Sequence, residues 1–340
     1  MSLQRSGRAE TGTALITGGA GFIGAFLCRA LVARGFRVHL LDNLSRGRRD
    51  AFLLEQLACD GVEFLEQDLA DPAFASRAGV DYSHIFHFAA ILGVQQVLER
   101  PYATLRTNVA LLETALDLAQ RQKALERFVF ASTSEVYAGS LEHLDLPIPT
   151  PEEVPLALPD LGRPRTAYML SKLYGEALVR HSGLPQTIVR PHNVYGPRMG
   201  NAHVIPQLLE RAHRLAPGAD LEVFSVDHSR CFCFVEDAVE LLARVALEPR
   251  ARDRVLNLGS PGPEIRMGAL AELILRTVGR SAGIAPRPAT PGSPARRCPD
   301  VHEIEAVTGF RAATSLEDGV RRTYDWYRPE FESRPEETAP

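Results

Sequence analysis

Two patterns of hydrophobic residues follow each other along the first 190 positions. Short apolar runs predict strands, and apolar residues at helical spacing predict helices. Short apolar runs predict six strands, at Thr13–Thr17, Arg37–Asp42, Val62–Glu66, 84–89, 127–132 and 186–190. Between these runs apolar residues recur at helical spacing, first over 22–33 and most extensively over 94–120 and 167–181. Strands that alternate with helices favour an α/β fold with a mostly parallel sheet covered on both faces.

The alternation weakens after Arg190, where proline and glycine become frequent. Helical patterns follow at 205–215, Val235–Leu247, Met267–Val278 and 316–327, with strand-like runs at Leu221–Phe224 and 255–258. We therefore expect three regions: an α/β domain over 1–190, completed by a return segment near 235–258; a smaller α/β domain over 191–330; and a flexible tail over 331–340.

The composition is that of an ordinary globular protein. Of 340 residues, 45% are hydrophobic and 24% charged, and the formal net charge is −4. This balance gives no broad attraction for nucleic acid or for an anionic membrane. No apolar run approaches the ~20 residues that span a bilayer, and the first residues lack the apolar stretch of a signal peptide. We expect a cytoplasmic protein with neither nucleic acid nor membrane as a partner.

Cysteine and histidine spacings indicate neither a disulfide framework nor a metal site. The five cysteines are odd in number and scattered, and the one close pair, Cys231 and Cys233, lacks the two-residue spacer of a redox or zinc hairpin. The ten histidines show no ligand spacing. We expect reduced cysteine thiols and no bound metal.

A glycine cluster joins the first predicted strand to the first predicted helix. Gly18, Gly21 and Gly24 allow a tight turn that brings the backbone close to a pyrophosphate, whose charge the helix N-terminus stabilises. Asp42 ends the second strand, where its carboxylate can accept hydrogen bonds from a ribose and would repel a 2′-phosphate. The pattern predicts a dinucleotide site that favours NAD over NADP.

Tyr168 and Lys172 lie four residues apart on a predicted helix, so both side chains project from one face. A nearby ammonium favours the phenolate and suits the tyrosine to exchange a proton with a substrate hydroxyl. Of the 38 basic residues only Lys123 and Lys172 are lysines, which suggests that a compact ammonium is required at one of them. The spacing from Tyr168 selects Lys172.

Taken together, these motifs resemble the extended short-chain dehydrogenase/reductase family, specifically its NAD-dependent nucleotide-sugar epimerases, dehydratases and decarboxylases. The resemblance spans roughly residues 12–328. It is carried by TGGAGFIG at 17–24, DNLSRG at 42–47, HFAA at 87–90, STSEVY at 132–137, YMLSK at 168–172, RPHNVYGPR at 190–198 and SRCFCFVED at 229–237.

The resemblance implies a Rossmann domain that binds NAD and a C-terminal domain that binds a nucleotide-diphosphate sugar. It also implies that the sugar is oxidised at its C4 hydroxyl by hydride transfer to NAD. It further implies that Tyr168 is the base, Lys172 its partner and Thr133 the hydroxyl that bonds the sugar O4. Ser134 and Glu135 complete the expected catalytic group. An acid at position 135 is common in the family's dehydratases and decarboxylases, whereas simple 4-epimerases often have an uncharged residue there.

The remaining candidate residues fall into two sets. Those expected at the cofactor are Gly18, Gly21, Phe22, Ile23, Gly24, Asp42, Asn43, Asp68, Leu69, Ala89, Asn108, Tyr168 and Lys172. Those expected at the substrate are Asn193, Arg198, Arg230, Arg297 and Asp300. The arginines offer planar forks suited to diphosphate oxygens, and the family places a diphosphate-binding arginine at the position of Arg230.

Several outcomes can follow oxidation at C4. The first hypothesis is a UDP-hexose or UDP-hexuronate 4-epimerase. The alternatives are a UDP-glucuronate decarboxylase, whose branch the PRTAYMLSK stretch at 164–172 also resembles, and a 4,6-dehydratase that uses Glu135 as the C5 base. A non-catalytic NAD-binding sensor or scaffold is disfavoured because Tyr168, Lys172 and Thr133 are all present. The family pairs the two long helices of the first domain, so we expect a homodimer.

Overall fold

The computed structural model describes residues 11–71, 74, 81–289 and 294–333. Its contacts divide the chain into two compact units, the first made of Met1–Thr133, Gly162–Val189 and Leu242–Val255, and the second of Ser134–Leu161, Arg190–Leu241 and Leu256–Pro340. The domain boundaries expected from the sequence stay a prediction, and the units place Ser134–Leu161 with the second half of the chain.

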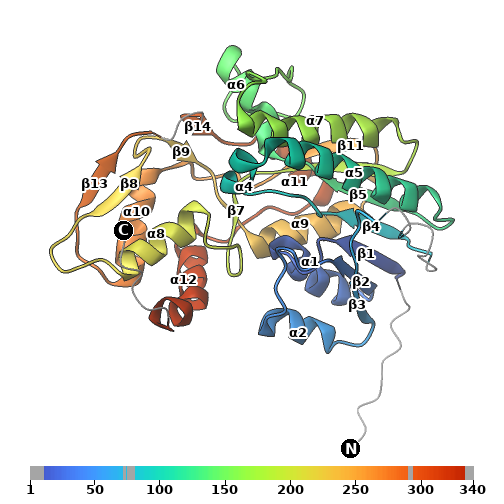
Figure 1. Cartoon of the computed structure of the whole chain (residues 1–340), viewed down its shortest axis with the longest axis horizontal. Helices are drawn as coiled ribbons and strands as arrows, with labels where there is room; N and C mark the ends of the chain where they lie inside the picture. Colours follow the sequence, from blue (N-terminus) through green and yellow to red (C-terminus); the bar gives the residue numbers. More distant parts are fainter. Residues whose placement is uncertain (1–10, 72–73, 75–80, 290–293, 334–340) are drawn as a thin grey trace, which may run out of the picture. The chain divides into compact units, whose positions relative to one another are not determined.

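A seven-stranded sheet forms the centre of the first unit (Figure 1). Its strands are β1 (Thr13–Thr17), β2 (Arg37–Asp42), β3 (Val62–Glu66), β4 (His84–His87), β5 (Arg127–Ala131), β6 (Gln186–Pro191) and β11 (Arg254–Leu258). Their order is β11-β6-β5-β4-β1-β2-β3, and the pairs from β6 to β3 are parallel. This order, reversing beside β1, confirms the expected Rossmann arrangement.

Both faces of this sheet are covered, which explains why its strands read as continuous apolar runs. Neighbouring residues of β1, such as Leu15 and Ile16, are both fully buried although their side chains point to opposite faces. Leu15 joins the apolar cluster that includes Leu112 and Ala115 of α5 (Pro101–Gln120). The helices of this unit are α1 (Phe22–Val32), α2 (Ala51–Leu57), α4 (Val94–Glu99), α5 and α7 (Pro164–His181).

The helix expected over 94–120 is wrong in one respect, because it is two helices, α4 and α5, that meet at Arg100. Pro101 has no backbone N–H and clashes with a preceding helical turn, so it begins a new helix instead of continuing one. For the same reason α7 begins at Pro164, three residues before the expected start. Apolar spacing alone does not reveal these two boundaries.

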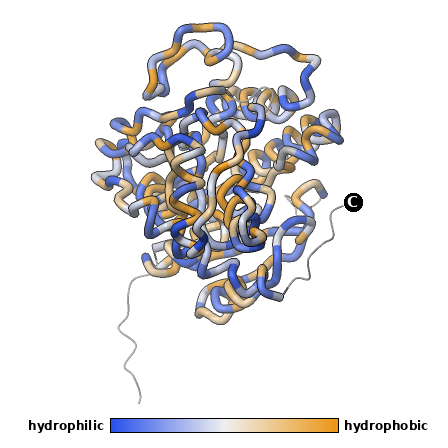
Figure 2. Tube along the Cα trace, turned by 90° about the vertical axis from the view of Figure 1, so that its left-hand side faces the viewer, coloured by the Kyte–Doolittle hydropathy of each residue, from blue (hydrophilic) through white to orange (hydrophobic). Residues whose placement is uncertain are grey.

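The second unit is built from short strands and amphipathic helices. Figure 2 shows hydrophobic and hydrophilic residues alternating along the coiled parts of the whole chain. Its helices are η1 (Ser134–Tyr137), α6 (Ala138–His143), α8 (Val204–His213), α10 (Met267–Val278), α11 (His302–Thr308) and α12 (Leu316–Ser333), and α9 (Val235–Leu247), followed by η2 (Pro249–Ala251), spans both units. Its strands are β7 (Val194–Tyr195), β8 (Leu221–Phe224), β9 (Ser229–Arg230), β10 (Cys233–Phe234), β12 (Ile265–Arg266), β13 (Ile284–Arg287) and β14 (Arg296–Arg297).

The expected tail over 331–340 is wrong at its first residues. Helix α12 continues to Ser333 and buries Phe331, whose ring stacks on that of Tyr327. Residues 334–340 lie outside the described residues. Within the part of the chain that the structure describes, no helix is long and apolar enough to cross a membrane.

Candidate functional site

The turn between β1 and α1 has the close backbone approach that its glycines predict. Gly18 adopts a φ of +72°, and a Cβ added at Gly24 would lie 2.5 Å from the Gly18 carbonyl oxygen. Gly21 is the N-cap of α1 and has no side chain to cap it. The first N–H groups of the helix, at Phe22 and Ile23, have no partner within the helix and are suited to bind a pyrophosphate.

Asp42 lies beside this turn at the end of β2. Its carboxylate accepts hydrogen bonds from the backbone N–H of Ala20 at 3.1 Å and of Leu44 at 2.8 Å. These two bonds hold the carboxylate in place beside the glycine turn, and carboxylate oxygens are suitable acceptors for ribose hydroxyls. The glycine turn and this oriented carboxylate fit the pyrophosphate and the adenosine ribose of NAD.

The other cofactor candidates occupy varied positions. Ala89 touches the glycine turn, since a Cβ on Gly18 would lie 2.9 Å from its nitrogen. Asn108 is buried in α5 and bonds both backbone groups of Ile91, at 2.7 and 3.0 Å, which fixes the segment after β4. Asn43 and Asp68 are exposed and bond the backbone N–H two residues on. Leu69 belongs to the apolar core.

Lys172 is buried in α7, and only 4% of its surface is exposed. Its Nζ donates a hydrogen bond to the carbonyl oxygen of Ala131 at 2.8 Å and lies 5.0 Å from the centre of the Phe130 ring and 6.0 Å from that of Tyr168. Burial lowers the pKa of Lys172 to about 8, and the charge of Glu176 opposes this shift. The helix thus places the ammonium between Tyr168 and the end of β5, just before half-buried Thr133.

In the second unit, Glu135 and Arg297 form an ion pair although 162 residues separate them. The guanidinium Nη1 lies 2.8 Å from the carboxylate Oε1, and the side chains of Arg297 and Glu135 are 11% and 24% exposed. Glu135 belongs to η1 and Arg297 to β14. The structure thus brings together one expected catalytic residue and one expected substrate residue.

Asn257 of β11 holds the segments that carry this ion pair. It is fully buried, and its Oδ1 accepts a hydrogen bond from Tyr137, two residues after Glu135, at 2.8 Å. Its Nδ2 donates to the carbonyl oxygens of Thr150 and Asp300, each at 3.0 Å. One amide therefore fixes the chain on both sides of the pair.

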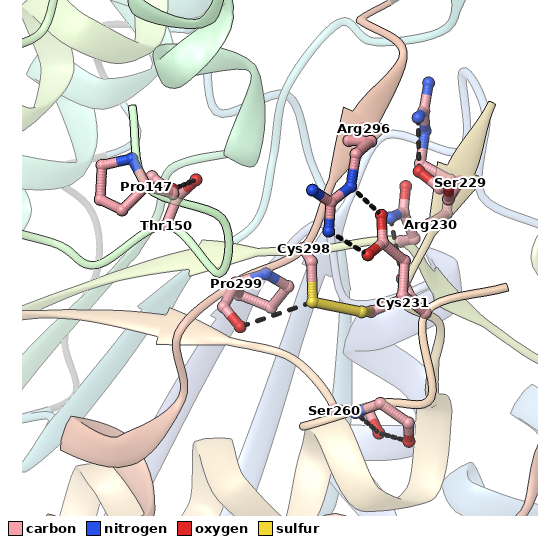
Figure 3. The surroundings of a disulfide bond; sticks show 12 residues. Pro147, Thr150, Ser229, Arg230, Cys231, Ser260, Arg296, Cys298 and Pro299 are labelled. Atoms are coloured by element: carbon pink, nitrogen blue, oxygen red, sulfur yellow. Dashed lines mark hydrogen bonds and ion pairs between the residues drawn. A yellow bond between two sulfur atoms is a disulfide. The ribbon is translucent and has the colours of Figure 1, made fainter. Parts of the chain in front are cut away.

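The expectation that all five cysteines are reduced thiols is wrong for Cys231 and Cys298, which form a disulfide (Figure 3). Parallel pairing of β9 with β14 places Arg230 opposite Arg297, so the residue that follows each arginine meets the other. Cys28, Cys59 and Cys233 are free. The pairing depends on this long-range register, for which the cysteine spacing gives no signal.

Besides Arg297, three of the expected substrate residues form hydrogen bonds within the protein. The Arg230 guanidinium donates to the carbonyl oxygens of Ser229 and Pro294, each at 2.7 Å. Asn193 donates from Nδ2 to the Cys231 carbonyl oxygen at 2.9 Å, and Asp300 accepts from the backbone N–H of His302 at 2.9 Å. Arg198 lies in the loop after β7 with a φ of +72°.

The sequence patterns miss two buried polar residues beside these groups, Glu176 and Asn257. A signal for Glu176 exists, because an acid four residues after Lys172 falls on the same face of α7. No local signal exists for Asn257. Among the described residues, no three His, Cys, Asp or Glu side chains gather as metal ligands.

Comparisons with known proteins identify the family and the relatives of this chain. The model of the NAD dependent epimerase/dehydratase family matches residues 14–259. The UDP-N-acetyl-alpha-D-glucosaminuronate decarboxylase of Bacillus cytotoxicus is 31% identical over 92% of this chain and 97% of its own length. UDP-glucuronic acid decarboxylase 1 of Arabidopsis thaliana is 31% identical over 95% of this chain and 73% of its own length.

Solved structures have the same fold. The UDP-glucose 4-epimerase of Thermotoga maritima, solved with UDP-glucose, is 27% identical, covers 94% of this chain and 99% of its own, and has a TM-score of 0.79. The UDP-glucuronic acid 4-epimerase of Bacillus cereus, solved with UDP-glucuronic acid and NAD, is 23% identical, with the same shares covered and a TM-score of 0.80. The chain belongs to the NAD-dependent epimerase/dehydratase family of extended short-chain dehydrogenases/reductases, and it is an enzyme that uses NAD.

Proposed function

We propose that this enzyme modifies a UDP-sugar and that its reaction is the decarboxylation of a UDP-hexuronate. The observation that carries the proposal is the Glu135–Arg297 ion pair. A guanidinium is a planar fork that matches a carboxylate, and Arg297 binds one in Glu135, so Arg297 also suits the C5 carboxylate of a hexuronate. The relatives that are named decarboxylases support decarboxylation over 4-epimerisation, which is the first hypothesis from the sequence.

The proposed chemistry begins at the C4 hydroxyl. Tyr168 removes its proton, Lys172 stabilises the phenolate, and Thr133 bonds O4. The glycine turn and Asp42 would hold NAD, which would supply the hydride acceptor for oxidation at C4 and the hydride donor for the later reduction. The resulting 4-ketone makes the C5 carboxylate a β-keto acid. The bond from C5 to the carboxylate carbon then breaks and carbon dioxide leaves. The electron pair of that bond forms an enolate, which takes a proton at C5 from solvent water.

The other expected residues also have proposed roles. The first domain, 1–190 with its return segment, binds NAD, and the second, 191–330, binds the nucleotide sugar. Arg230 and Arg198 face the diphosphate, Asn193 holds the backbone beside Cys231, and Asp300 follows Arg297 in the substrate loop. Ser134 is buried next to Glu135 and positions it.

Product analysis tests the reaction. We expect the purified enzyme to release carbon dioxide from UDP-glucuronate or UDP-N-acetylglucosaminuronate and to leave a UDP-pentose, identified by mass spectrometry and NMR. The Tyr168→Phe variant is the control and should release none. A product of unchanged mass from either hexuronate, or from UDP-glucose, would contradict decarboxylation and establish 4-epimerisation. That second candidate is favoured by the likeness to the Thermotoga maritima 4-epimerase. Loss of water would instead indicate dehydration.

We also propose a homodimer formed through α5 and α7. Both helices leave large apolar side chains exposed, since Tyr102 is 75% and Tyr174 46% exposed. A hollow of about 370 Å³ lies between the two helices. It is lined by Glu113, Leu116, Asp117, Gln120, Tyr174, Ala177, Leu178, His181 and Ser182. A second copy of the pair would cover this surface and complete a four-helix bundle.

Sedimentation velocity at micromolar concentration should give the mass of two chains. A Tyr174→Glu variant, which places a charge in the proposed interface, should sediment as a monomer. A matched charge on the exposed surface of the second unit, Phe224→Glu, should leave the dimer intact. Sedimentation of the wild-type protein as one chain would contradict the dimer.

The proposed location is the cytoplasm. The disulfide between Cys231 and Cys298 argues against this location, because most cytosolic proteins keep their thiols reduced. Fractionation of the source cells, followed by detection of the protein in the cytosolic fraction, is the measurement that decides it.

A further inference from the structure

Helix α7 carries three ionisable side chains at four-residue spacing, Tyr168, Lys172 and Glu176. Residues four apart lie on the same face of a helix. Lys172 and Glu176 are each only 4% exposed, so the helix buries an ammonium and a carboxylate one turn apart. The chemistry proposed above uses Tyr168 and Lys172 and leaves the buried carboxylate without a role.

Glu176 contacts the end of β5, as Lys172 does. The hydroxyl of Ser132 donates a hydrogen bond to Oε1 of Glu176 at 2.5 Å, a short bond of the kind that ionised acceptors make. Lys172 bonds the carbonyl oxygen of the preceding residue, Ala131, at 2.8 Å. Two consecutive residues of the strand end are thus tied to one face of α7, and Thr133 follows directly.

The charge of Glu176 matters to Lys172 because a buried ammonium is costly without a partner. Burial lowers the pKa of Lys172 to about 8, and the negative charge of Glu176 raises it. Without this charge, less of the ammonium would remain at neutral and alkaline pH.

Among the described residues, Glu176 is the one anion whose charge acts on Lys172. His87 of β4 is buried, and burial first and the Lys172 charge second lower its pKa to about 3, so the ring is neutral. Its Nδ1 forms a hydrogen bond with the Thr17 hydroxyl at 2.9 Å. Helix α5 presents the uncharged amide of Asn108, which bonds Ser171 at 3.3 Å. Arg46, which follows β2, is a cation that interacts with Tyr168.

We propose, on the basis of the roles proposed above for Tyr168 and Lys172, that Glu176 is a positioning residue for hydride transfer. Its carboxylate balances the buried ammonium of Lys172, and its bond to Ser132 fixes the strand end that carries Thr133. The catalytic face of α7 therefore consists of a phenol, an ammonium and a carboxylate in successive turns. The carboxylate acts through Lys172 and does not touch the sugar.

The Glu176→Gln variant tests the electrostatic part, because glutamine keeps the shape and the bond to Ser132 but removes the charge. Turnover requires the Lys172 ammonium, which is present below the pKa of this group. Loss of the opposing anion lowers that pKa, so the alkaline limb of the pH–rate profile should move to lower pH by about one unit. A Glu176→Asp variant keeps the charge and should restore much of the alkaline activity.

Ser132→Ala is the matched control, since it removes the hydrogen bond and keeps the charge of Glu176. We expect it to lower turnover with the alkaline limb in its wild-type place. A purely structural role for Glu176 predicts that Glu176→Gln, which keeps the bond to Ser132, has an alkaline limb at the wild-type pH. That result would overturn the proposal.

A second readout needs no sugar, so it separates this proposal from the proposed reaction. Ultraviolet titration of the enzyme with bound NAD, taken as the difference from the same protein with Tyr168→Phe, reports ionisation of the Tyr168 phenol. We expect this phenol to ionise at higher pH in Glu176→Gln than in the wild-type enzyme, because the ammonium that favours the phenolate is lost earlier. Identical titrations of the two folded proteins would overturn the proposal, whichever sugar the enzyme uses.

Discussion

The Lys172→Arg variant is expected to turn over at least ~10-fold more slowly than the wild-type enzyme, although arginine keeps the positive charge. Lys172 is 4% exposed, its Nζ lies 2.8 Å from the Ala131 carbonyl oxygen, and the Phe130 ring is 5.0 Å away. A planar guanidinium is larger than this space, and overfilling a packed interior costs roughly 1–3 kcal/mol. The charge must therefore move away from the Tyr168 phenol.

Displacement of the charge raises the pKa of Tyr168, and each unit of that rise lowers the ionised fraction of the base tenfold, or about 1.4 kcal/mol. Steady-state turnover at pH 7 with the substrate identified by product analysis is the measurement. Lys123→Arg is the matched control, since Lys123 is exposed beyond the end of α5 and should tolerate the same exchange. Wild-type turnover by both variants would show that Lys172 is outside the catalytic group.

The sequence predicts most of the first unit because its strands are buried on both faces. The run Thr13–Thr17 has three consecutive apolar residues between two threonines and ends at glycines, so its pattern and its boundaries are both local. The expected strand over 127–132 differs from β5 by one residue, and the expected helix over 22–33 differs from α1 by one. The seven-stranded order follows from right-handed crossovers and the return strand, which the sequence places near 255–258.

The short strands of the second unit are not predictable in the same way. β9 and β14 contain two residues each, too few for an alternation to appear. They are held by pairing with each other across more than sixty residues of chain, and by the disulfide that follows them. Such elements exist because of tertiary contacts, and local sequence carries little information about them.

The candidate site shows the same difference between residues found from local spacing and residues joined by long-range contacts. Tyr168 and Lys172 are found by their spacing, because helical geometry converts four residues into one face. The Glu135–Arg297 ion pair and the bond from Tyr137 to Asn257 join residues 162 and 120 positions apart, so no spacing rule reaches them. The sequence names Glu135 and Arg297 separately, for different roles, and only the fold pairs them.

Removal of the Cys231–Cys298 disulfide is expected to lower the free energy of unfolding by roughly 4 kcal/mol. The bond closes a loop with a sequence separation of 67 residues. Crosslinking a loop of this length removes conformational entropy from the unfolded chain, and the chain-entropy relation gives a value of this size. Both cysteines are buried, at 1% and 5% exposure, so the bond is protected from reductant until the second unit opens.

Urea unfolding of the Cys231→Ala/Cys298→Ala double variant against the oxidised wild-type protein measures this difference. Alanine is used because a buried serine hydroxyl would add a desolvation cost of its own. Cys59→Ala, which removes an exposed free thiol, is the control and should unfold at the wild-type midpoint. Thiol titration of the unfolded, unreduced wild-type protein should find three reactive cysteines. Five reactive thiols would show that the pair is reduced in solution.

The same variant should bind UDP more weakly, because the disulfide lies directly after Arg230 and Arg297. β9 and β14 pair over only two residues, Ser229 with Arg296 and Arg230 with Arg297. The disulfide therefore does much to fix the register of the two strands. Without it the Arg230 guanidinium, proposed to bind the diphosphate, loses its fixed position, and ordering it on binding costs free energy. We expect a rise in the calorimetric Kd for UDP in the double variant and none in Cys59→Ala. An unchanged Kd, together with lowered stability, would restrict the disulfide to a stabilising role.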